Sequence, residues 1–280
     1  MPELPEVETI VRSLANGARH GGLNVIGQKI TAASVLWERT VENMPAAQFV
    51  QRIFGQSVDN VHRRGKFLVF TLSADTLLMH LRMSGDLRVE AAYDGGHQVV
   101  PPHKHDRIIL LFESGQRLVF NNPRKFGRVW LTDRPEDVLD ALGPEPLDPA
   151  LTGEKFCAML QSHQRMLKPL LMDQHFLAGM GNIYTDEALF RAGLHPRAIS
   201  STLTAEQCAL LLREIRNVLN EGIKRNGASI DWVYRGGDFQ NDFKVYGRAG
   251  ETCPRCGETI QRLLVGQRGT HICPRCQRVG

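Results

Sequence analysis

The stretch KFLVFTLSADTLLMHLRM, residues 66–83, consists of two short apolar runs separated by the polar turn SAD. Short runs rich in Val, Leu, Phe and Thr between turn residues are typical of β-strands. Two further runs, RIILLF (107–112) and RLVFN (117–121), follow with ESG between them. This texture extends from about Val25 to Leu131 and predicts a β-sandwich or a β-barrel.

Helical patterns flank the β-rich region. Apolar residues recur at helical spacing over residues 6–14, and Pro5 suits the first turn of such a helix. The segment GPEPLDP (143–149) has three prolines in seven residues, which indicates a linker. Beyond it the longest helical pattern covers residues 205–224, and Thr204 with Gln207 forms a capping box before it.

The patterns together predict an α+β protein. Its parts are an N-terminal helix with a β-sandwich domain (1–140), a linker (141–151), a helical domain (152–243) and a C-terminal hairpin (244–280). A chain of 280 residues with 42% hydrophobic and 23% charged residues is an ordinary globular composition. No apolar run approaches the roughly 20 residues of a membrane span. The start of the chain lacks the basic and apolar regions of a signal peptide, so we expect a cytoplasmic protein without a membrane partner.

Four of the six cysteines form two Cys-Pro-Arg-Cys motifs. They are Cys253, Cys256, Cys273 and Cys276, with sixteen residues between the pairs. This spacing is typical of a four-thiolate zinc site, and four thiolates leave no open position for substrate. The sequence therefore predicts one structural Zn²⁺, and two disulfides are the alternative that a reducing cytosol disfavours. Cys157 and Cys208 lie among apolar neighbours and are expected to be small core residues.

Positive charge is concentrated at the C-terminus. Residues 244–280 contain seven Lys or Arg and two Glu, a net charge of +5, which leaves −1 for the preceding 243 residues. A clustered basic segment is the electrostatic signature of a protein that binds a phosphate backbone, although a solvated basic terminus would look the same.

Nine motifs point to one family. They are PELPEVET (2–9), RRGKF (63–67), HLRMSG (80–85), KHDR (104–107), NPRKFGR (122–128), LGPEPL (142–147), GMGNIYTDEALF (179–190), VYGRAGETCPRCG (245–257) and the closing zinc pairs. In this order they resemble formamidopyrimidine-DNA glycosylase. The resemblance implies a helix-two-turn-helix in the helical domain and a zinc-ribbon hairpin. It also implies a monomer, nucleoid-associated if bacterial, that acts on double-stranded DNA containing oxidised bases.

The implied activity is that of a bifunctional DNA glycosylase and AP lyase. Such an enzyme excises 8-oxoguanine and formamidopyrimidines and then cleaves the strand by β,δ-elimination. The resemblance assigns catalysis to four residues, Pro2, Glu3, Lys66 and Arg268. Removal of Met1 would give Pro2 a free secondary amine with a pKa of roughly 8, which is suited to nucleophilic attack and an iminium intermediate. Without the resemblance, Pro2 and Glu3 would be interpreted as an ordinary helix start.

The resemblance also assigns residues that contact DNA. Met83, Arg124 and Phe126 would fill the void left by the extruded nucleotide, and His105, Lys168 and Asn182 would bind phosphates. The glycine turn before Asn182 is itself a candidate anion site, because the first amides of a helix are free. Glu6 is expected near the lesion in a supporting role.

Two departures from the family pattern concern DNA contacts. Gln164 stands where a lysine is common, with Arg165 beside it as the substitute phosphate ligand. In the lesion-recognition loop, Ser229 is present but Ala228 has no hydroxyl group, so backbone amides are expected to contact the damaged base.

Two alternative functions remain. An endonuclease VIII-like enzyme would prefer oxidised pyrimidines, but Leu4 stands where that branch typically has glycine. A catalytically silent DNA-binding protein of the same fold would not need the intact Pro2, Glu3 and Lys66.

Overall fold

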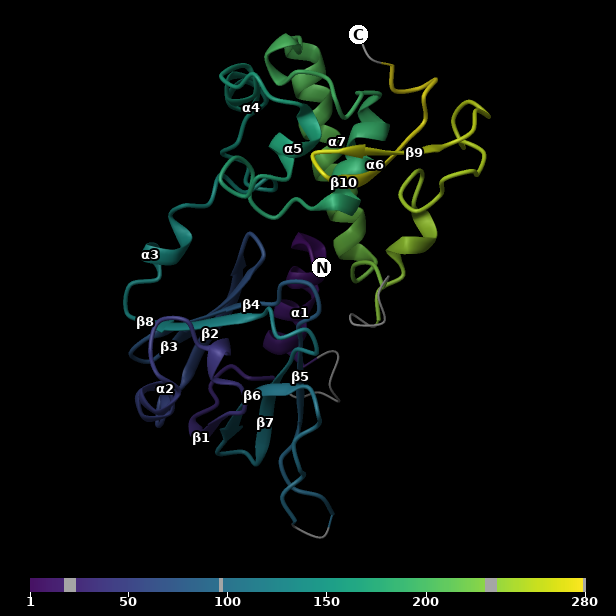
Figure 1. Ribbon diagram of the computed structural model, residues 1–280. Coiled ribbons are helices and arrows are strands. Elements are labelled where there is room, and N and C mark those ends of the chain that lie inside the picture. The colour runs from purple at the N-terminus through teal and green to yellow at the C-terminus, as the bar shows by residue number, and fades with distance from the viewer. Residues whose placement is uncertain (18–23, 96–97, 230–235, 279–280) are drawn as a thin grey trace. The chain divides into compact units, whose positions relative to one another are not determined.

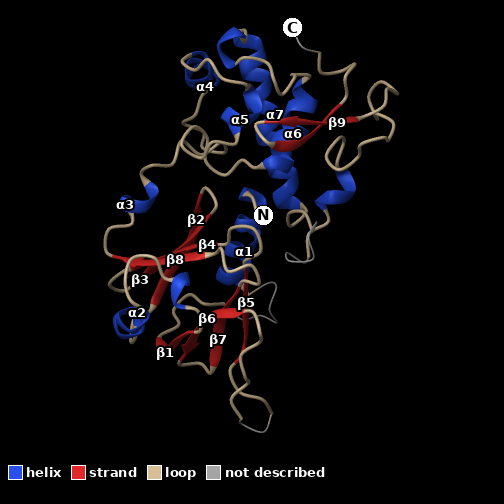
Figure 2. Ribbon diagram, in the orientation of Figure 1, coloured by secondary structure: helices blue, strands red, loops and turns tan. Residues whose placement is uncertain are grey.

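Figures 1 and 2 show the computed structural model, which describes residues 1–17, 24–95, 98–229 and 236–278. The chain divides into two compact units. Of the described residues, unit 1 holds 1–2, 229 and those within 6–140, whereas unit 2 holds 3–5, 141–228 and 236–278. The first helix therefore begins in unit 2 and continues in unit 1.

Unit 1 contains two four-stranded antiparallel sheets. The first has the order β1 (Ile30–Val35), β6 (Asp106–Phe112), β7 (Gln116–Asn121) and β5 (Asp86–Ala91). The second has the order β2 (Val58–Arg64), β3 (Phe67–Leu72), β4 (Thr76–His80) and β8 (Arg128–Thr132). The unit also contains helices α1 (Leu4–Asn16), α2 (Ala46–Ile53) and α3 (Glu136–Leu139), and the short 3₁₀ helix η1 (Glu38–Thr40).

One apolar core joins the two sheets of unit 1. Leu110 and Phe120 of the first sheet share it with Phe70 and Leu77 of the second, and α1 adds residues such as Ile10. Apolar side chains of both sheets pack face to face, as they do in a β-sandwich. The predicted sandwich is thus confirmed.

Helix α2 was not predicted, because the whole stretch from Val25 to Leu131 was interpreted as β. Phe49 and Ile53 lie four residues apart in α2 and are fully buried in the same core. A helix of eight residues shows helical spacing over only about two turns, so its pattern is easily taken for a strand.

Unit 2 is helical apart from a C-terminal hairpin. Its helices are α4 (Gly153–Gln161), α5 (Leu167–Leu171), α6 (Asn182–Ala192) and α7 (Ala205–Lys224), with 3₁₀ turns η2 (Ser200–Thr202) and η3 (Phe239–Asp242). The hairpin pairs β9 (Gln261–Val265) with β10 (Arg268–Ile272). The capping box predicted for α7 is present, with Thr204 and Gln207 each accepting a hydrogen bond from the other's backbone amide.

Helix α6 is surrounded by protein. Residues 183–190 are all buried, including the polar Thr185, Asp186 and Glu187. Buried carboxylates require partners, and these two acids organise the neighbouring segments. No helix among the described residues is long and apolar enough to cross a membrane.

Candidate functional site

Three turns meet at one edge of the second sheet in unit 1. Lys66 immediately precedes β3, residues 81–85 follow β4, and residues 122–127 precede β8. The antiparallel register aligns the start of β3 with the end of β4 and with the start of β8. Motifs far apart in the sequence therefore converge at this edge.

The first sheet brings His105 to the same two turns. His105 directly precedes β6, whose first residue is in register with the end of β7. The start of β5 is also in register with the end of β7, and the turns 81–85 and 122–127 connect β4 to β5 and β7 to β8. His105 also accepts a hydrogen bond from the amide of Asn122 at its own carbonyl, at 2.8 Å.

The two turns contact each other through the residues predicted to fill the void in DNA. The backbone amide of Arg124 donates to Ser84 Oγ at 3.3 Å, and Nη1 of the Arg124 side chain lies 3.9 Å from Met83 Sδ. Met83 and Phe126 are large apolar side chains that are 44% and 54% exposed. The structure thus brings together on one surface the residues that the sequence assigns to this role.

Backbone strain marks the turns that carry predicted DNA contacts. All four described non-glycine residues with a positive φ lie one to three positions from such a residue: Arg82, Lys125, Asn226 and Gln267. The left-handed conformation costs about 1–2 kcal/mol for most residues, so the surrounding structure must impose it. At Lys125 (φ 61°) the ammonium lies 3.8 Å from the ring centre of Trp37, a cation–π contact that the sequence did not reveal.

Lys66 is almost fully buried, near a histidine that stays neutral. His80 accepts the amide of Arg82 at Nδ1, at 3.0 Å. Burial lowers the pKa of His80 to about 3, and the positive charges of Arg82 and Lys66 act in the same direction. At neutral pH the imidazole therefore adds no charge beside Lys66.

Glu3 is held by the N-terminus of α6, within unit 2. Its Oε1 accepts from the amide of Ile183 at 3.0 Å and its Oε2 from the amide of Tyr184 at 3.4 Å. A Cβ at Gly181 would lie 2.2 Å from the Glu3 carboxyl carbon, so only glycine permits this approach. The prediction of free amides in the glycine turn is corrected for these two groups, because Glu3 is the anion that they bind.

Lys168 is corrected as a phosphate ligand. Its side chain is 0% exposed, and its Nζ donates to Asp186 Oδ1 at 2.7 Å, Thr270 Oγ1 at 2.8 Å and the Gly269 carbonyl at 3.0 Å. An ammonium has three protons, so none is left for DNA. Burial lowers the pKa of Lys168, and the carboxylate of Asp186 opposes that shift.

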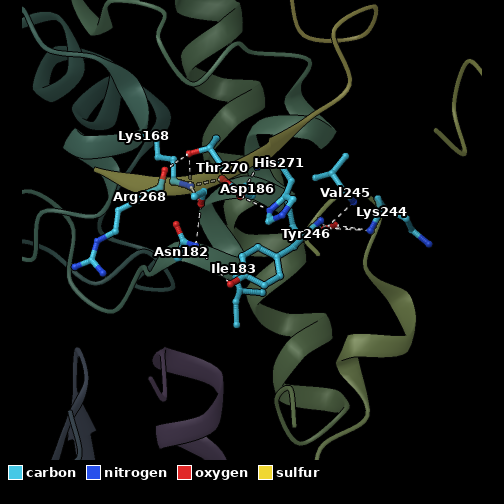
Figure 3. A network of polar contacts seen from close by, with 12 residues as sticks. Lys168, Asn182, Ile183, Asp186, Lys244, Val245, Tyr246, Arg268, Thr270 and His271 are labelled. Carbon is cyan, nitrogen blue, oxygen red and sulfur yellow. Dashed lines mark hydrogen bonds and ion pairs between the residues drawn. The ribbon is translucent and has the colours of Figure 1, made fainter. Parts of the chain in front are cut away.

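Asn182 also points into the protein. Its Nδ2 donates to the Gly269 carbonyl at 3.1 Å and to Tyr246 Oη at 3.4 Å, whereas its buried Oδ1 has no partner in the described part of the chain. Lys168 and Asn182 therefore converge on the carbonyl of the residue after Arg268. Figure 3 shows this network and the Arg268 side chain directed away from it. Arg268 is exposed, so the buried groups fix the backbone that presents it.

The remaining predicted residues have varied surroundings. Pro2 is buried, and Glu6 is 2% exposed on α1. Arg165 is exposed and forms an ion pair with Asp173 at 2.9 Å. Ser229 is half-buried, and the lesion-loop residue at position 230 lies outside the described residues.

Glu187 is a buried acid that the sequence analysis missed. Its Oε1 accepts the amides of Lys244, Val245 and Tyr246 at 2.9–3.0 Å, and its Oε2 accepts that of Lys244 at 2.9 Å. Burial raises the pKa of Glu187, while these amides and Arg191 oppose the shift. The contacts tie α6 to the start of the C-terminal hairpin segment, as Figure 3 shows. Two adjacent acids, Asp186 and Glu187, in the middle of a helical pattern were the available signal.

The four paired cysteines converge in space. Their Sγ atoms all lie within 4.8 Å of one another, with Cys256 and Cys273 at 3.4 Å and Cys253 and Cys276 at 4.0 Å. A tetrahedral zinc with Zn–S bonds of about 2.3 Å requires S–S separations of about 3.8 Å. The donor set and its spacing therefore fit one zinc ion.

Family models match almost the whole chain. Residues 1–129 match the formamidopyrimidine-DNA glycosylase N-terminal domain, and residues 142–233 match the H2TH domain of the same family. Residues 250–279 match a zinc finger found in FPG and IleRS. With the sulfur geometry, this match identifies the four cysteines as the ligands of a structural zinc.

Formamidopyrimidine-DNA glycosylases from other organisms resemble this chain along almost its full length. The formamidopyrimidine-DNA glycosylases of Protochlamydia amoebophila and Chloroflexus aurantiacus are 39% and 42% identical over 99% of this chain, covering 100% and 98% of theirs. Two Lactococcus lactis Fpg structures, one with FAPY-dG DNA and one with abasic DNA, are each 36% identical with a TM-score of 0.87. They cover 99% of this chain and 100% and 99% of their own. The chain belongs to the formamidopyrimidine-DNA glycosylase family.

Proposed function

We propose that this chain is a bifunctional DNA glycosylase and AP lyase of base excision repair that removes oxidised purines from double-stranded DNA. The observation that carries the proposal is the Glu3 carboxylate, fixed on two amides of α6 directly after Pro2 in the chain. The Lactococcus lactis relatives were captured with FAPY-dG and with abasic DNA, the substrate and the intermediate that such an enzyme would handle.

Pro2 is the nucleophile in this proposal. Loss of Met1 converts its nitrogen from a tertiary amide into a free secondary amine. The amine attacks C1′ of the damaged nucleotide, and the C1′–N bond to the base breaks. The C1′–O4′ bond of the sugar then opens as O4′ takes a proton, which leaves a cationic iminium that acidifies the C2′ proton. Loss of that proton expels the 3′ phosphate, and a second elimination expels the 5′ phosphate.

Glu3 links the activation of the amine to the departure of the base. Two amide donors at a helix N-terminus favour the ionised carboxylate in the resting enzyme. Transfer of a proton from the Pro2 ammonium to Glu3 then produces a neutral amine and a carboxylic acid together. The acid supplies the proton that the sugar oxygen needs.

The other assigned residues act on the phosphates and the gap in DNA. Lys66 serves in proton transfer during elimination, and exposed Arg268 grips the phosphates that flank the extruded nucleotide. Met83, Arg124 and Phe126 occupy the vacated stack. Lys168 and Asn182 contribute by holding the Gly269 carbonyl next to Arg268.

Leu4 gives weaker support for purine preference than the sequence suggested. Its side chain is 0% exposed in the core of unit 2, and its amide donates to the Gly179 carbonyl at 3.1 Å. Packing alone therefore explains a leucine here. A cleavage assay distinguishes the proposed function from the endonuclease VIII-like alternative, because a purine-specific enzyme cleaves 8-oxoguanine duplexes in preference to thymine glycol duplexes.

The test is a borohydride trap on processed protein lacking Met1. With 8-oxoguanine DNA, the reduced adduct should map to Pro2, and Lys66→Ala should retain an adduct at the same residue. Pro5→Ala is the matched control. The nitrogen of Pro5 is a peptide nitrogen within the chain, so replacing this proline should leave the borohydride adduct unchanged. An adduct on a lysine would overturn the mechanism, and absence of any adduct would leave a DNA-binding protein without this chemistry.

A further inference from the structure

We propose that Cys157 and Cys208 form a reversible disulfide that joins α4 to α7 when the protein meets hydroperoxides. Neither residue belongs to the zinc site or to the proposed reaction. Both lie in unit 2, in two helices that pack against each other.

The two thiols are already in contact. Their Sγ atoms are 2.7 Å apart, although the residues are 51 positions apart in the chain. A disulfide bond is about 2.05 Å long, so the sulfurs need only a small approach to bond. Cys208 is 0% exposed and Cys157 is 8% exposed, and no other described cysteine belongs to their core. The fold therefore selects one partner for each thiol.

A shallow pocket reaches one of the two thiols. It has a volume of about 500 Å³ and lies between the first turns of α4 and α7, lined by Thr152, Gly153, Glu154, Cys157, Ala205 and Ala209. Cys208 does not line it. A small oxidant entering this pocket meets Cys157 first, so Cys157 is the thiol that is attacked and Cys208 is the one that resolves.

The surroundings of Cys157 and Cys208 should make their oxidation slow. Cys208 is the fourth residue of α7, near the N-terminus of the helix, where the dipole favours a thiolate, whereas Cys157 is the middle residue of α4. Burial outweighs this effect at Cys208 and, together with the hydrogen bond to Cys157, raises its pKa to about 12. Cys208 therefore stays a thiol at neutral pH, so we expect oxidation to need sustained exposure to peroxide.

The chemistry balances with a hydroperoxide as the only oxidant. Cys157–SH and ROOH give Cys157–SOH and ROH, as the peroxide O–O bond breaks and sulfur is oxidised. Cys208 sulfur then attacks the sulfenic sulfur, the S–O bond breaks, and water leaves with the thiol proton. A dithiol reductant reverses the reaction through thiol–disulfide exchange.

The bond would stabilise the helical unit. Closing a loop of this length removes conformational freedom from the unfolded chain. The helices already pack against each other, with Phe156 of α4 and Leu212 of α7 in the same buried core, so the folded state gives up little to form the bond. Oxidation should therefore raise the melting temperature of the enzyme under the conditions that damage DNA bases.

The experiment uses the zinc-loaded full chain treated with hydrogen peroxide. Free thiols are then blocked with iodoacetamide, and peptides are mapped without reduction. We expect a linked Cys157–Cys208 peptide lacking the mass of two hydrogens, and a melting temperature several degrees higher that dithiothreitol restores. Zinc content is measured in the same samples, so oxidation of the metal thiolates is scored separately.

Variants and alternative outcomes complete the test. Cys157→Ala and Cys208→Ala should each abolish the peroxide-induced rise. The wild-type map decides the matter even where a variant folds poorly. Links between Cys157 and a zinc ligand, over-oxidised Cys157 without a link, or two unmodified thiols after zinc has been lost would each overturn the proposal.

Discussion

Lys168 and Asp186 form a fully buried ion pair inside unit 2, with the ammonium and carboxylate 2.7 Å apart. Asp186 also accepts the amide of His271 at 2.9 Å, so one carboxylate serves both α5 and β10. A buried ion pair gives little net stability, but loss of one partner leaves an uncompensated charge. Its value here is positional, because Lys168 and its neighbours fix the turn that carries Arg268.

Lys168→Met should therefore act through stability. We expect a loss of about 3–5 kcal/mol in the free energy of unfolding, measured with denaturant, because Asp186 is left charged and buried. Adding Asp186→Asn should recover much of the loss, since an amide oxygen still accepts from His271. DNA binding should recover in parallel. A direct phosphate contact at Lys168 would show the opposite, with stability restored and binding still impaired.

His80 provides a test at acid pH. Its pKa is lowered to about 3 in the folded state, whereas an unfolded histidine titrates near 6.5, so the unfolded chain binds the extra proton between these values. The stabilising contribution is complete above pH 6.5 and decreases as pH falls towards 3. His80→Gln should flatten the dependence of unfolding free energy on pH by about 1.4 kcal/mol per unit between pH 6 and 4. If the unfolding free energies of the wild type and of His80→Gln depend on pH in the same way, the His80 imidazole is not neutral and buried in the folded protein.

At the scale of elements, the sequence predicted contacts between residues close together in the chain, but it did not predict which polar side chains the fold buries. The capping box of α7 needs only Thr204 and Gln207, which are three positions apart, so the sequence predicted it. The inward orientation of Lys168 and Asn182 depends on Gly269, which is 101 and 87 positions away from them in the chain. A pattern within one segment carries no information about such a partner, and the family resemblance that assigned both residues to DNA does not supply it either.

Glu187 anchors the start of the hairpin segment to α6. Glu187→Gln replaces one acceptor oxygen with a donor that faces backbone amides, so we expect a loss of about 2–3 kcal/mol in unfolding free energy. Zinc should also be lost faster to a chelator, measured with a colorimetric indicator. Glu221→Gln is the control, because that carboxylate is 48% exposed and forms an ion pair with Arg191 of α6. Equal zinc retention in both variants would show that the anchor does not support the metal site.

Phe126 in the turn 122–127 should assist base extrusion, which precedes the chemical step. Phe126→Ala removes one stacking side chain worth about 1–3 kcal/mol, so excision of 8-oxoguanine should fall about tenfold. Cleavage of a preformed abasic site should change less, because little unstacking remains to be done. Phe54→Ala serves as control, since Phe54 is an exposed phenylalanine of the same unit, 64% exposed. Equal losses on both substrates would assign Phe126 to the fold alone.

At the scale of the molecule, each unit has a large apolar core, but the C-terminal hairpin relies on another source of stability. Unit 1 buries a continuous apolar core between its sheets. The C-terminal hairpin has a much smaller core, in which Val245, Ile260 and two zinc cysteines pack against Phe190 of α6. So few apolar residues do not supply the free energy to order the segment, and zinc must provide the rest.

Zinc removal should therefore uncouple DNA binding from the folding of unit 1. Cys256→Ser, or prolonged chelation of the wild type, should abolish binding to lesion DNA in fluorescence anisotropy, because the turn that presents Arg268 loses its support. The unfolding transition of unit 1 should persist, since its core contains no zinc ligand. Returning zinc to the chelated wild type should restore binding, whereas Cys256→Ser should stay inactive. Full DNA binding by protein shown by elemental analysis to lack zinc would mean that the Lys168, Asn182 and Glu187 contacts hold Arg268 in place without the metal.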